Sequence, residues 1–226
     1  MGRVPVSLPP SRWAFDPTAW PSDDAVAVGA ELEPSTILAA YRRGAFPMPL
    51  DDVVPMVWWS PLRRGVLRPA ALVLPRSLRR SRRRYQVRID TAFEQVVNHC
   101  ADPRRDGGWI SADIRAAYVR LHGLGWAHSV ETFDQAGVLV GGLYGLAIGG
   151  LFAGESMFHH ATDASKVALI GLVEALRDEH LDQRLIDVQW RTPHLATLGA
   201  EAITRADYLA RLPRLLDLPL PAAFDA

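Results

Sequence analysis

The spacing of apolar and polar positions in the second half of the chain predicts an antiparallel meander, then a helix, then another strand. Gly149 and Gly150 form a hairpin turn between two apolar runs, and Asp134 to Gly137 has the composition of a turn. The predicted strands cover 128–133, 138–148, 151–158 and 185–189. The predicted helices cover 164–179, which Asp163 caps, and 205–216.

The first half has a weaker pattern. Residues 1–34 are proline-rich and predicted to be irregular, and 45–61 predict a loop with many aromatic residues. The predicted strands cover 66–74 and 85–89. The predicted helices cover 36–43 between a Ser35 cap and Gly44, 76–83, 91–99 with a Thr91–Glu94 capping box, and 111 to Gly123 or Gly125. This order predicts an α+β protein, and its second half follows an acetyltransferase-type core by fold-level analogy.

The composition fits one large domain or two small ones. Of the 226 residues, 49% are hydrophobic and 22% are charged, which is enough to build a core and argues against disorder. No apolar run reaches the roughly 18 residues of a membrane helix, and no signal-peptide core follows the N-terminus. The single cysteine, Cys100, offers no internal disulfide and no cysteine-based metal site. We therefore expect a soluble cytoplasmic protein.

Charge is distributed unevenly. The net charge is zero, but ten arginines and no acidic residue lie between Val53 and Ile89, leaving 15 basic and 25 acidic residues elsewhere. Five of these arginines recur at spacings of three and four along one face of a predicted helix: Arg76, Arg79, Arg80, Arg83 and Arg84. Phosphate is the natural partner of such a face, with an affinity that falls with salt. The alternative is a solvated basic face, and a membrane partner would need a longer apolar side.

Several strings, in order, resemble the leucyl/phenylalanyl-tRNA–protein transferase family over about residues 28 to 212. They are YRRGAFPM (41–48), WWSP (58–61), WI (109–110), HSVE (128–131), LVGGLYG (139–145), LFAGESMF (151–158), ASK (164–166), LIDVQ (185–189) and LGA (198–200). The resemblance implies a small N-terminal domain, residues 1–61, and an acetyltransferase-like (GNAT-type) domain with a mixed, largely antiparallel sheet, residues 62–226. It also implies transfer of Leu or Phe from aminoacyl-tRNA to proteins beginning with Arg or Lys, marking them for degradation, with no cofactor or metal.

The aminoacyl-adenosine end of a tRNA needs apolar and aromatic surfaces. Trp109, in a glycine-containing loop, would stack on a base, an interaction worth about 1–3 kcal/mol. In the family a Trp often shares this role at the position of Met48, which can still pack against a ring. The alternative for Trp109 is a core aromatic residue. By resemblance the side-chain pocket is lined by Leu143, Phe152, Met157, Leu169 and Leu172, which the residues alone would place in the core.

Six glycines in the predicted hairpin strands weaken them unless something approaches closely. They are Gly141, Gly142, Gly145, Gly149, Gly150 and Gly154. A ligand and a packed helix explain them equally well.

Asp187 and Gln189 are the expected catalytic pair. At i and i+2 of a strand their side chains share one face. Asp187 would hold the Gln189 amide, and the Gln189 oxygen would accept a hydrogen bond from the attacking amine. A neutral α-amine, with a pKa near 8, needs no strong base, so orientation would supply much of the acceleration. The alternative is an edge strand whose polar residues face water.

Glu155 lies in an otherwise apolar strand, where an unpaired carboxylate is costly. We expect it to receive the cationic N-terminal Arg or Lys of the acceptor. The alternative is a structural ion pair, for instance with Lys166 or an arginine.

Three other functions use parts of the same pattern. A CoA-dependent N-acetyltransferase needs a glycine-rich pyrophosphate loop, whereas residues 159–165 contain no glycine and one Asp. A two-domain peptidoglycan-building aminoacyl-tRNA transferase is longer than this chain. A non-catalytic RNA-binding protein would use the arginines but would have no need of Asp187, Gln189 and Glu155.

Overall fold

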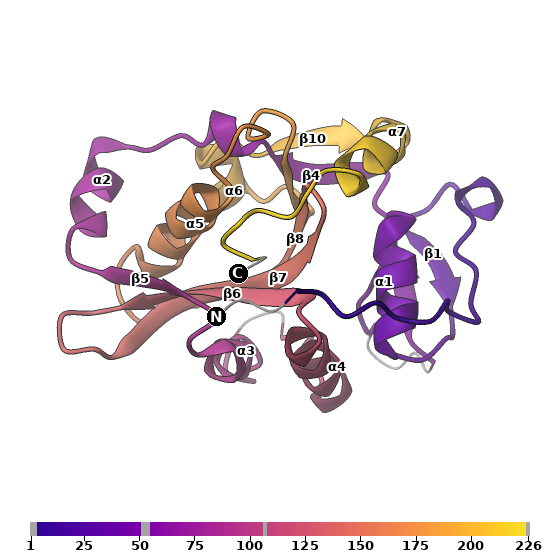
Figure 1. Cartoon of the computed structure of the whole chain (residues 1–226), viewed down its shortest axis with the longest axis horizontal. Helices are drawn as coiled ribbons and strands as arrows, with labels where there is room; N and C mark the ends of the chain where they lie inside the picture. Colours follow the sequence, from indigo (N-terminus) through magenta and orange to yellow (C-terminus); the bar gives the residue numbers. More distant parts are fainter. Residues whose placement is uncertain (1–3, 51–54, 106–107, 225–226) are drawn as a thin grey trace.

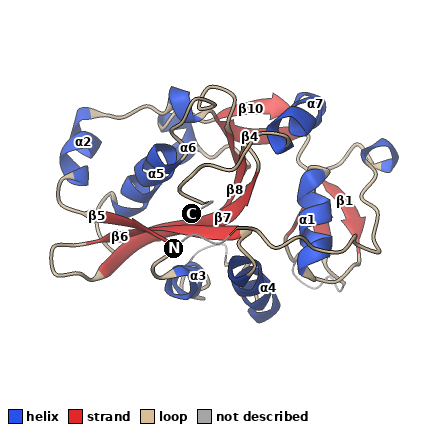
Figure 2. Ribbon diagram, in the orientation of Figure 1, coloured by secondary structure: helices blue, strands red, loops and turns tan. Residues whose placement is uncertain are grey.

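The structure is a computed structural model, and it describes residues 4–50, 55–105 and 108–224. The strands of these residues form two sheets (Figures 1 and 2). The smaller sheet has the order β1-β3-β2 and lies beside α1; these elements are β1 (Ala25–Val28), β2 (Phe46–Pro47), β3 (Val57–Trp59) and α1 (Pro34–Arg42). Two of these strands fall within 45–61, so the prediction of a plain loop there is wrong. Strands of two and three residues are too short to produce a periodic pattern.

The larger sheet has the order β10-β4-β9-β8-β7-β6-β5, and only its β8–β9 pair is parallel among the described strands. The strands are β4 (Arg63–Leu67), β5 (Gln86–Ile89), β6 (Ala127–Phe133), β7 (Leu139–Ile148), β8 (Leu151–His159), β9 (Leu185–Gln189) and β10 (Glu201–Thr204). This confirms the predicted α+β class and the mixed, largely antiparallel sheet. The domain division at 61/62 stays a prediction.

Helices cover both faces of this sheet (Figure 1). Helices α3 (Phe93–Cys100) and α4 (Ala112–Gly123) lie on one face; α2 (Arg76–Arg82), α5 (Ala164–Ala175) and α6 (Pro193–Thr197) lie on the other. Helix α7 (Arg205–Leu216) packs near β4 and β10. Every residue of β7 is buried, because this strand is covered from both sides. No helix of the described chain is long and apolar enough to span a bilayer.

Several local predictions fail at helix ends. Helix α1 begins at Pro34 after Glu33, so Ser35 lies inside it rather than capping it. The Thr91–Glu94 capping box is absent, because the Thr91 hydroxyl donates to Glu131 of β6 instead. A long-range partner therefore replaces the local one. Ser111, in contrast, caps α4 as predicted, accepting the N–H of Ile114.

Two element assignments also need correction. The strand predicted over 66–74 is β4, which ends at Leu67, and Pro69–Ala71 forms a 3-10 turn. Helix α5 ends at Ala175 rather than near residue 179, and Asp163 precedes it without a capping hydrogen bond. The short β1, α6 and β10 were not predicted, and β1 contradicts the prediction that residues 1–34 are irregular.

A packed helix and a bound ligand were the two explanations for the glycines of the hairpin strands. For Gly141 the packed helix is the correct one. A Cβ on Gly141 would lie 2.6 Å from the Cβ of Ala164, at the start of α5. Such a contact is impossible without moving the helix, so Gly141 allows α5 to approach the sheet. Gly154, in contrast, has no atom closer than 3.6 Å at the position of a Cβ and borders open space.

Candidate functional site

A cavity of about 280 Å³ opens where β8 and β9 separate. The two strands pair only as far as Ala153 and Asp187, and residues beyond this point on both strands line the cavity. The lining includes all five apolar residues that the resemblance implied: Leu143, Phe152, Met157, Leu169 and Leu172. Glu155 and Gln189 also line the cavity. The cavity is at the small end of ligand-pocket sizes, and an apolar wall of this kind selects by size and shape.

Glu155 reaches its position through a β-bulge. Along the β7–β8 pair, Tyr144 is opposite Ser156 and Gly145 is opposite Gly154, so Glu155 is the extra residue. A bulge leaves one residue outside the ladder and re-aims its side chain. The pattern of apolar residues around Glu155 contains no signal for this extra residue.

Two tyrosines hold the Glu155 carboxylate. The Tyr41 hydroxyl of α1 donates to Oε1 at 2.7 Å, and the Tyr118 hydroxyl of α4 donates to Oε2 at 2.9 Å. The predicted alternative of an ion pair with Lys166 is wrong, because the Lys166 ammonium lies 2.9 Å from Asp163. Glu155 is therefore held by neutral donors from the N-terminal part of the chain and from the opposite face of the sheet.

Burial raises the pKa of Glu155 to about 8. The hydrogen bonds from Tyr41 and Tyr118 oppose this shift, since they favour the carboxylate, and the nearby charge of Asp187 adds to it. Near neutral pH, Glu155 thus exchanges between its neutral and charged forms. Its pKa is close to that of a free α-amine.

Asp187 is fully buried and forms an ion pair that the sequence did not predict. Its carboxylate accepts hydrogen bonds from Arg64 Nε and Nη2, at 2.8 and 2.5 Å, and from the Tyr208 hydroxyl at 2.9 Å. Arg64 also donates to the Gly44 carbonyl at 3.0 Å. This arginine belongs to the acid-free run, yet it is internal and links the end of α1 to β9.

Asp187 holds Gln189 through the backbone. Its Oδ1 accepts the Gln189 N–H at 3.0 Å, so the expectation that it holds the side-chain amide is wrong. Gln189 has a φ of 55°, a left-handed conformation that costs about 1–3 kcal/mol in a residue of this type. The carboxylate thus stabilises an unusual turn at the end of β9.

The Gln189 side chain remains available to a ligand. Both residues of the pair are buried, so the alternative of a water-facing edge strand is wrong. The Gln189 Nε2 atom has no hydrogen-bond partner within the described part of the chain, although it is buried and Gln189 lines the cavity. Most buried polar groups are hydrogen-bonded, so an unpaired amide here points to a bound group that would complete it.

Trp109 and Met48 lie elsewhere. Both are partly buried and pack against the apolar cluster on the α3–α4 side of the sheet. Neither belongs to the described lining of the 280 Å³ cavity. Their stacking role stays a prediction.

The predicted arginine face is exposed on α2 and on the two residues that follow it, Arg83 and Arg84. Leu78 and Ser81 are the buried residues of this helix, and the Ser81 hydroxyl donates to Asp163, just before α5, at 2.8 Å. All five predicted arginines are exposed, and among the described residues no carboxylate lies within 4 Å of their guanidinium groups: Arg76, Arg79, Arg80, Arg83 and Arg84. Arg82 differs, since it pairs with Glu174 of α5. Helix α2 lies on the same face of the sheet as α5, which contributes Leu169 and Leu172 to the cavity (Figure 1).

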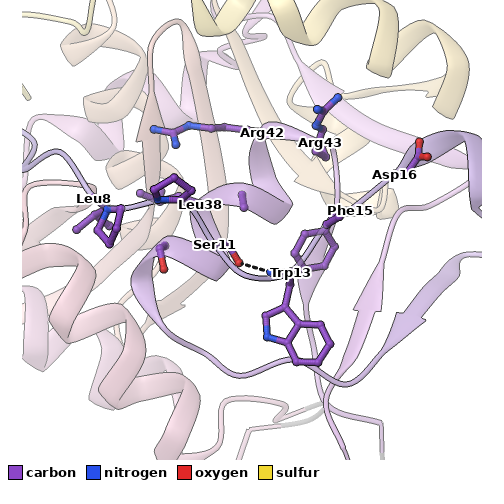
Figure 3. A pocket seen from close by; sticks show the side chains of 13 residues that line it. Leu8, Ser11, Trp13, Phe15, Asp16, Leu38, Arg42 and Arg43 are labelled. Atoms are coloured by element: carbon purple, nitrogen blue, oxygen red, sulfur yellow. Dashed lines mark hydrogen bonds between the residues drawn. The ribbon is translucent and has the colours of Figure 1, made fainter.

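A separate hollow of about 760 Å³ lies beside α1 (Figure 3). Trp13 and Phe15 border it on one side and Arg42 and Arg43 on the other. It contains none of the predicted site residues.

Four residues that organise the site were not predicted from the sequence. Tyr41 and Tyr118 are single tyrosines in helices, and Tyr208 lies in the distant α7. Arg64 was counted only as one of the ten arginines of the acid-free run. Their partners are between 21 and 123 residues away in the chain. Only the folded topology brings them together.

Residues 66–213 match a family model described as leucyl/phenylalanyl-tRNA protein transferase, and residues 30–62 match the model of that family's N-terminal domain. A protein named leucyl/phenylalanyl-tRNA–protein transferase from Anaeromyxobacter dehalogenans (strain 2CP-C) is 48% identical over 222 residues, covering 96% of this chain and 94% of its own. One of the same name from Aromatoleum aromaticum (strain DSM 19018 / LMG 30748 / EbN1) is 54% identical over 194 residues, covering 84% and 80%.

Solved structures are more distant. L-PGS from Bacillus licheniformis is 10% identical with a TM-score of 0.40, and the match covers 68% of this chain and 64% of that one, under two thirds of its length. A tandem GNAT protein from the clavulanic acid biosynthesis pathway is 18% identical with a TM-score of 0.34, covering 80% and 62%. At these TM-scores neither likeness supports an argument about the site.

Proposed function

Because the chain belongs to the leucyl/phenylalanyl-tRNA–protein transferases, we propose that it moves Leu or Phe from aminoacyl-tRNA to the N-terminal α-amine of proteins beginning with Arg or Lys. Met would fit the same pocket. The transfer marks the acceptor for degradation and takes place in the cytoplasm. The observation that carries the proposal is the small apolar cavity with Glu155 and the unpaired Gln189 amide on its wall.

The tRNA would bind through its backbone. The exposed arginines of α2 have no carboxylate partners among the described residues, so phosphates of the acceptor stem can pair with them. Helix α2 packs against α5, and α5 forms one wall of the cavity. A stem on α2 would therefore deliver its 3′ end on the same side of the sheet as the cavity. Trp109 and Met48 are proposed to contact the terminal adenosine.

The esterified side chain would enter the cavity. Leu and Phe bury apolar surface there, and each methylene changes the binding free energy by only about 1–3 kcal/mol. We therefore expect the cavity to accept several unbranched or γ-branched apolar side chains and to reject a side chain branched at Cβ on steric grounds.

The reaction is aminolysis of an ester. The neutral α-amine attacks the ester carbonyl, a C–N bond forms, and the C–O bond to the tRNA ribose breaks. The proton lost by the amine ends on the departing ribose hydroxyl, and the ribose itself would help to carry it. The Gln189 oxygen would accept a hydrogen bond from the amine and so hold its lone pair towards the carbonyl. Asp187 would act indirectly, by fixing the turn at Gln189.

Glu155 would recognise the acceptor. Glu155 lines the cavity, and its carboxylate is bound by two tyrosine hydroxyls. When ionised, it would offer a buried negative charge to an Arg or Lys side chain. A cation would in turn favour ionisation of Glu155, whose pKa of about 8 leaves it largely neutral at pH 7 without one.

The start of α5 argues against CoA-dependent acetyl transfer. A pyrophosphate at this helix N-terminus needs free backbone N–H groups and positive charge. Here Asp163 precedes the helix, and its carboxylate is held by Ser81 and Lys166. A fixed negative charge at this position disfavours a pyrophosphate.

A transfer assay tests the proposal. Purified protein, tRNA charged with radiolabelled Phe, and peptides beginning with Arg, Lys or Ala are mixed without ATP, added metal or CoA. We expect label on the Arg and Lys peptides and little on the Ala peptide. Folded protein that transfers no label to any peptide would contradict the proposed function.

A further inference from the structure

The C-terminal segment ends behind the cavity. Phe224 is fully buried, and it belongs to the same apolar cluster as Leu143, Phe152 and Leu169. Figure 1 shows the described part of the segment after α7 running back towards β6 and β7. Eight residues after α7 therefore carry the chain back to the centre of the molecule.

Phe224 stacks on a residue of the cavity wall. Its ring lies 5.7 Å from that of Phe152 and 4.4 Å from the imidazole of His128, at an interplanar angle of 28° to each. His128 of β6 is opposite Gly145 of β7. A Cβ on Gly145 would lie 2.6 Å from Phe152 Cε1, so the glycine provides the space that the Phe152 ring occupies. Phe224 closes the space that remains behind this ring.

The segment is anchored to the rest of the molecule by Arg184 and contains a turn of its own at its end. Arg184, itself buried, donates to the carbonyls of Pro219 and Gly149 at 3.1 and 3.3 Å and pairs with Asp178. Nearer the end, the Phe224 N–H donates to the Pro221 carbonyl at 2.8 Å. A buried guanidinium that binds a tail carbonyl costs desolvation unless it is fully paired. The pairing therefore fixes where the tail, and with it Phe224, can lie.

We propose that Phe224 determines which amino-acid side chains the cavity accepts, by holding the Phe152 ring in place from behind. This inference rests on the proposed function, since it takes the cavity to be the aminoacyl pocket. Phe224 is not among the described lining residues, so it is a positioning residue that acts through Phe152. Truncating a buried Phe leaves a void that its neighbours fill only partly. The Phe152 ring then moves back, and the cavity widens enough for a larger ring.

The experiment compares Phe224→Ala and Phe224→Leu with a matched control. Phe15→Ala removes another buried Phe that packs against an aromatic ring, that of Trp58 at 4.8 Å, but lies outside the apolar cluster of the cavity. One tRNA, charged in turn with Leu, Phe or Trp, is the donor, and a single Arg-initiated peptide is the acceptor. The readout is the ratio of kcat/KM for Trp to that for Leu.

We expect the Trp-to-Leu ratio to rise about tenfold in Phe224→Ala, to rise less in Phe224→Leu, and to be unchanged in Phe15→Ala. General destabilisation lowers both rates together and leaves the ratio constant. If Phe224→Ala does not fold, the milder Phe224→Leu decides the question. An unchanged ratio in the folded Phe224 variants overturns the inference.

A variant in the lining separates this inference from the proposed function. Leu172→Ala enlarges the cavity directly and should raise the same ratio. A rise in Leu172→Ala without one in the Phe224 variants overturns the role of Phe224 alone. No change in either means that the cavity is not the aminoacyl pocket.

Discussion

Gln189 and Glu155 face the same cavity but are held in different ways. Gln189 occupies a left-handed turn that Asp187 fixes through the backbone N–H, so its side-chain amide is free for a ligand. Glu155 is the extra residue of a bulge, and two tyrosine hydroxyls bind both of its oxygens. The first arrangement suits the positioning of a reacting amine, and the second suits recognition of a cation.

Gln189→Ala should lower kcat for transfer roughly 10- to 100-fold, because the variant loses the hydrogen bond that orients the amine. Affinity for charged tRNA should stay within about twofold, since α2 is untouched. Gln189→Asn keeps an amide and tolerates the left-handed backbone, so it should retain intermediate activity. Single-turnover transfer and filter binding measure the two quantities; full-speed transfer by Gln189→Ala would rule out its role.

The preference for a cationic acceptor should depend on pH. Glu155 is neutral well below its pKa of about 8 and charged above it, so the preference for Arg over a neutral first residue should rise between pH 7 and 9. The rate for either peptide also rises as its α-amine loses a proton, and the ratio of the two rates cancels this effect. Glu155→Gln should give a low ratio that does not change with pH. A pH-independent preference in the wild-type protein would count against Glu155.

At the scale of elements, two features position the cavity and the exposed arginines. Strands β8 and β9 part after three paired residues, which opens the cavity, and Arg64 of β4 fixes the end of β9 from the other side. Helix α2 adds the exposed charge and is attached to α5 through Ser81 and Asp163. Each element thus contributes either geometry or charge.

Asp187→Ala should destabilise the protein by about 3–5 kcal/mol, because it leaves the buried Arg64 charge unpaired. Loss of transfer in this variant alone would therefore not prove a catalytic role. The double variant Arg64→Met/Asp187→Leu should recover much of the stability without recovering transfer. Chemical denaturation measures the first effect; a single variant as stable as the wild type would refute the importance of the pair.

Arginines on α2 and directly after it should differ in their contribution to tRNA binding, according to whether they already have a carboxylate partner. Arg83→Ala should weaken tRNA binding and reduce the slope of log affinity against log salt by about one, as expected for one lost phosphate contact. Arg82→Ala, on the same helix, removes a guanidinium that already pairs with Glu174 and should change the slope less. Equal effects of the two substitutions, or no effect of either, would show that the α2 arginines do not contact the backbone individually.

At the scale of the whole molecule, the sequence predicted what depends on neighbours in the chain. The hairpin at Gly149 and Gly150, the strand 185–189 and the C-terminal helix follow from local periodicity, and the structure has all three. It could not predict that Arg64 is internal, because its partner Asp187 is 123 residues away. The tail that returns Phe224 to the cavity is equally non-local, since nothing in residues 217–224 marks where they pack.

The central claim is that the esterified side chain occupies the space between β8, β9 and α5, beside Gln189. The most direct measurement is a crystal structure of the protein with a stable amide analogue of phenylalanyl-adenosine. We predict that the Phe ring lies against Leu143, Phe152 and Leu172, with the α-carbonyl within hydrogen-bonding reach of the Gln189 side chain. A well-ordered analogue whose ring lies outside this cavity, for instance in the hollow beside α1, would contradict the account.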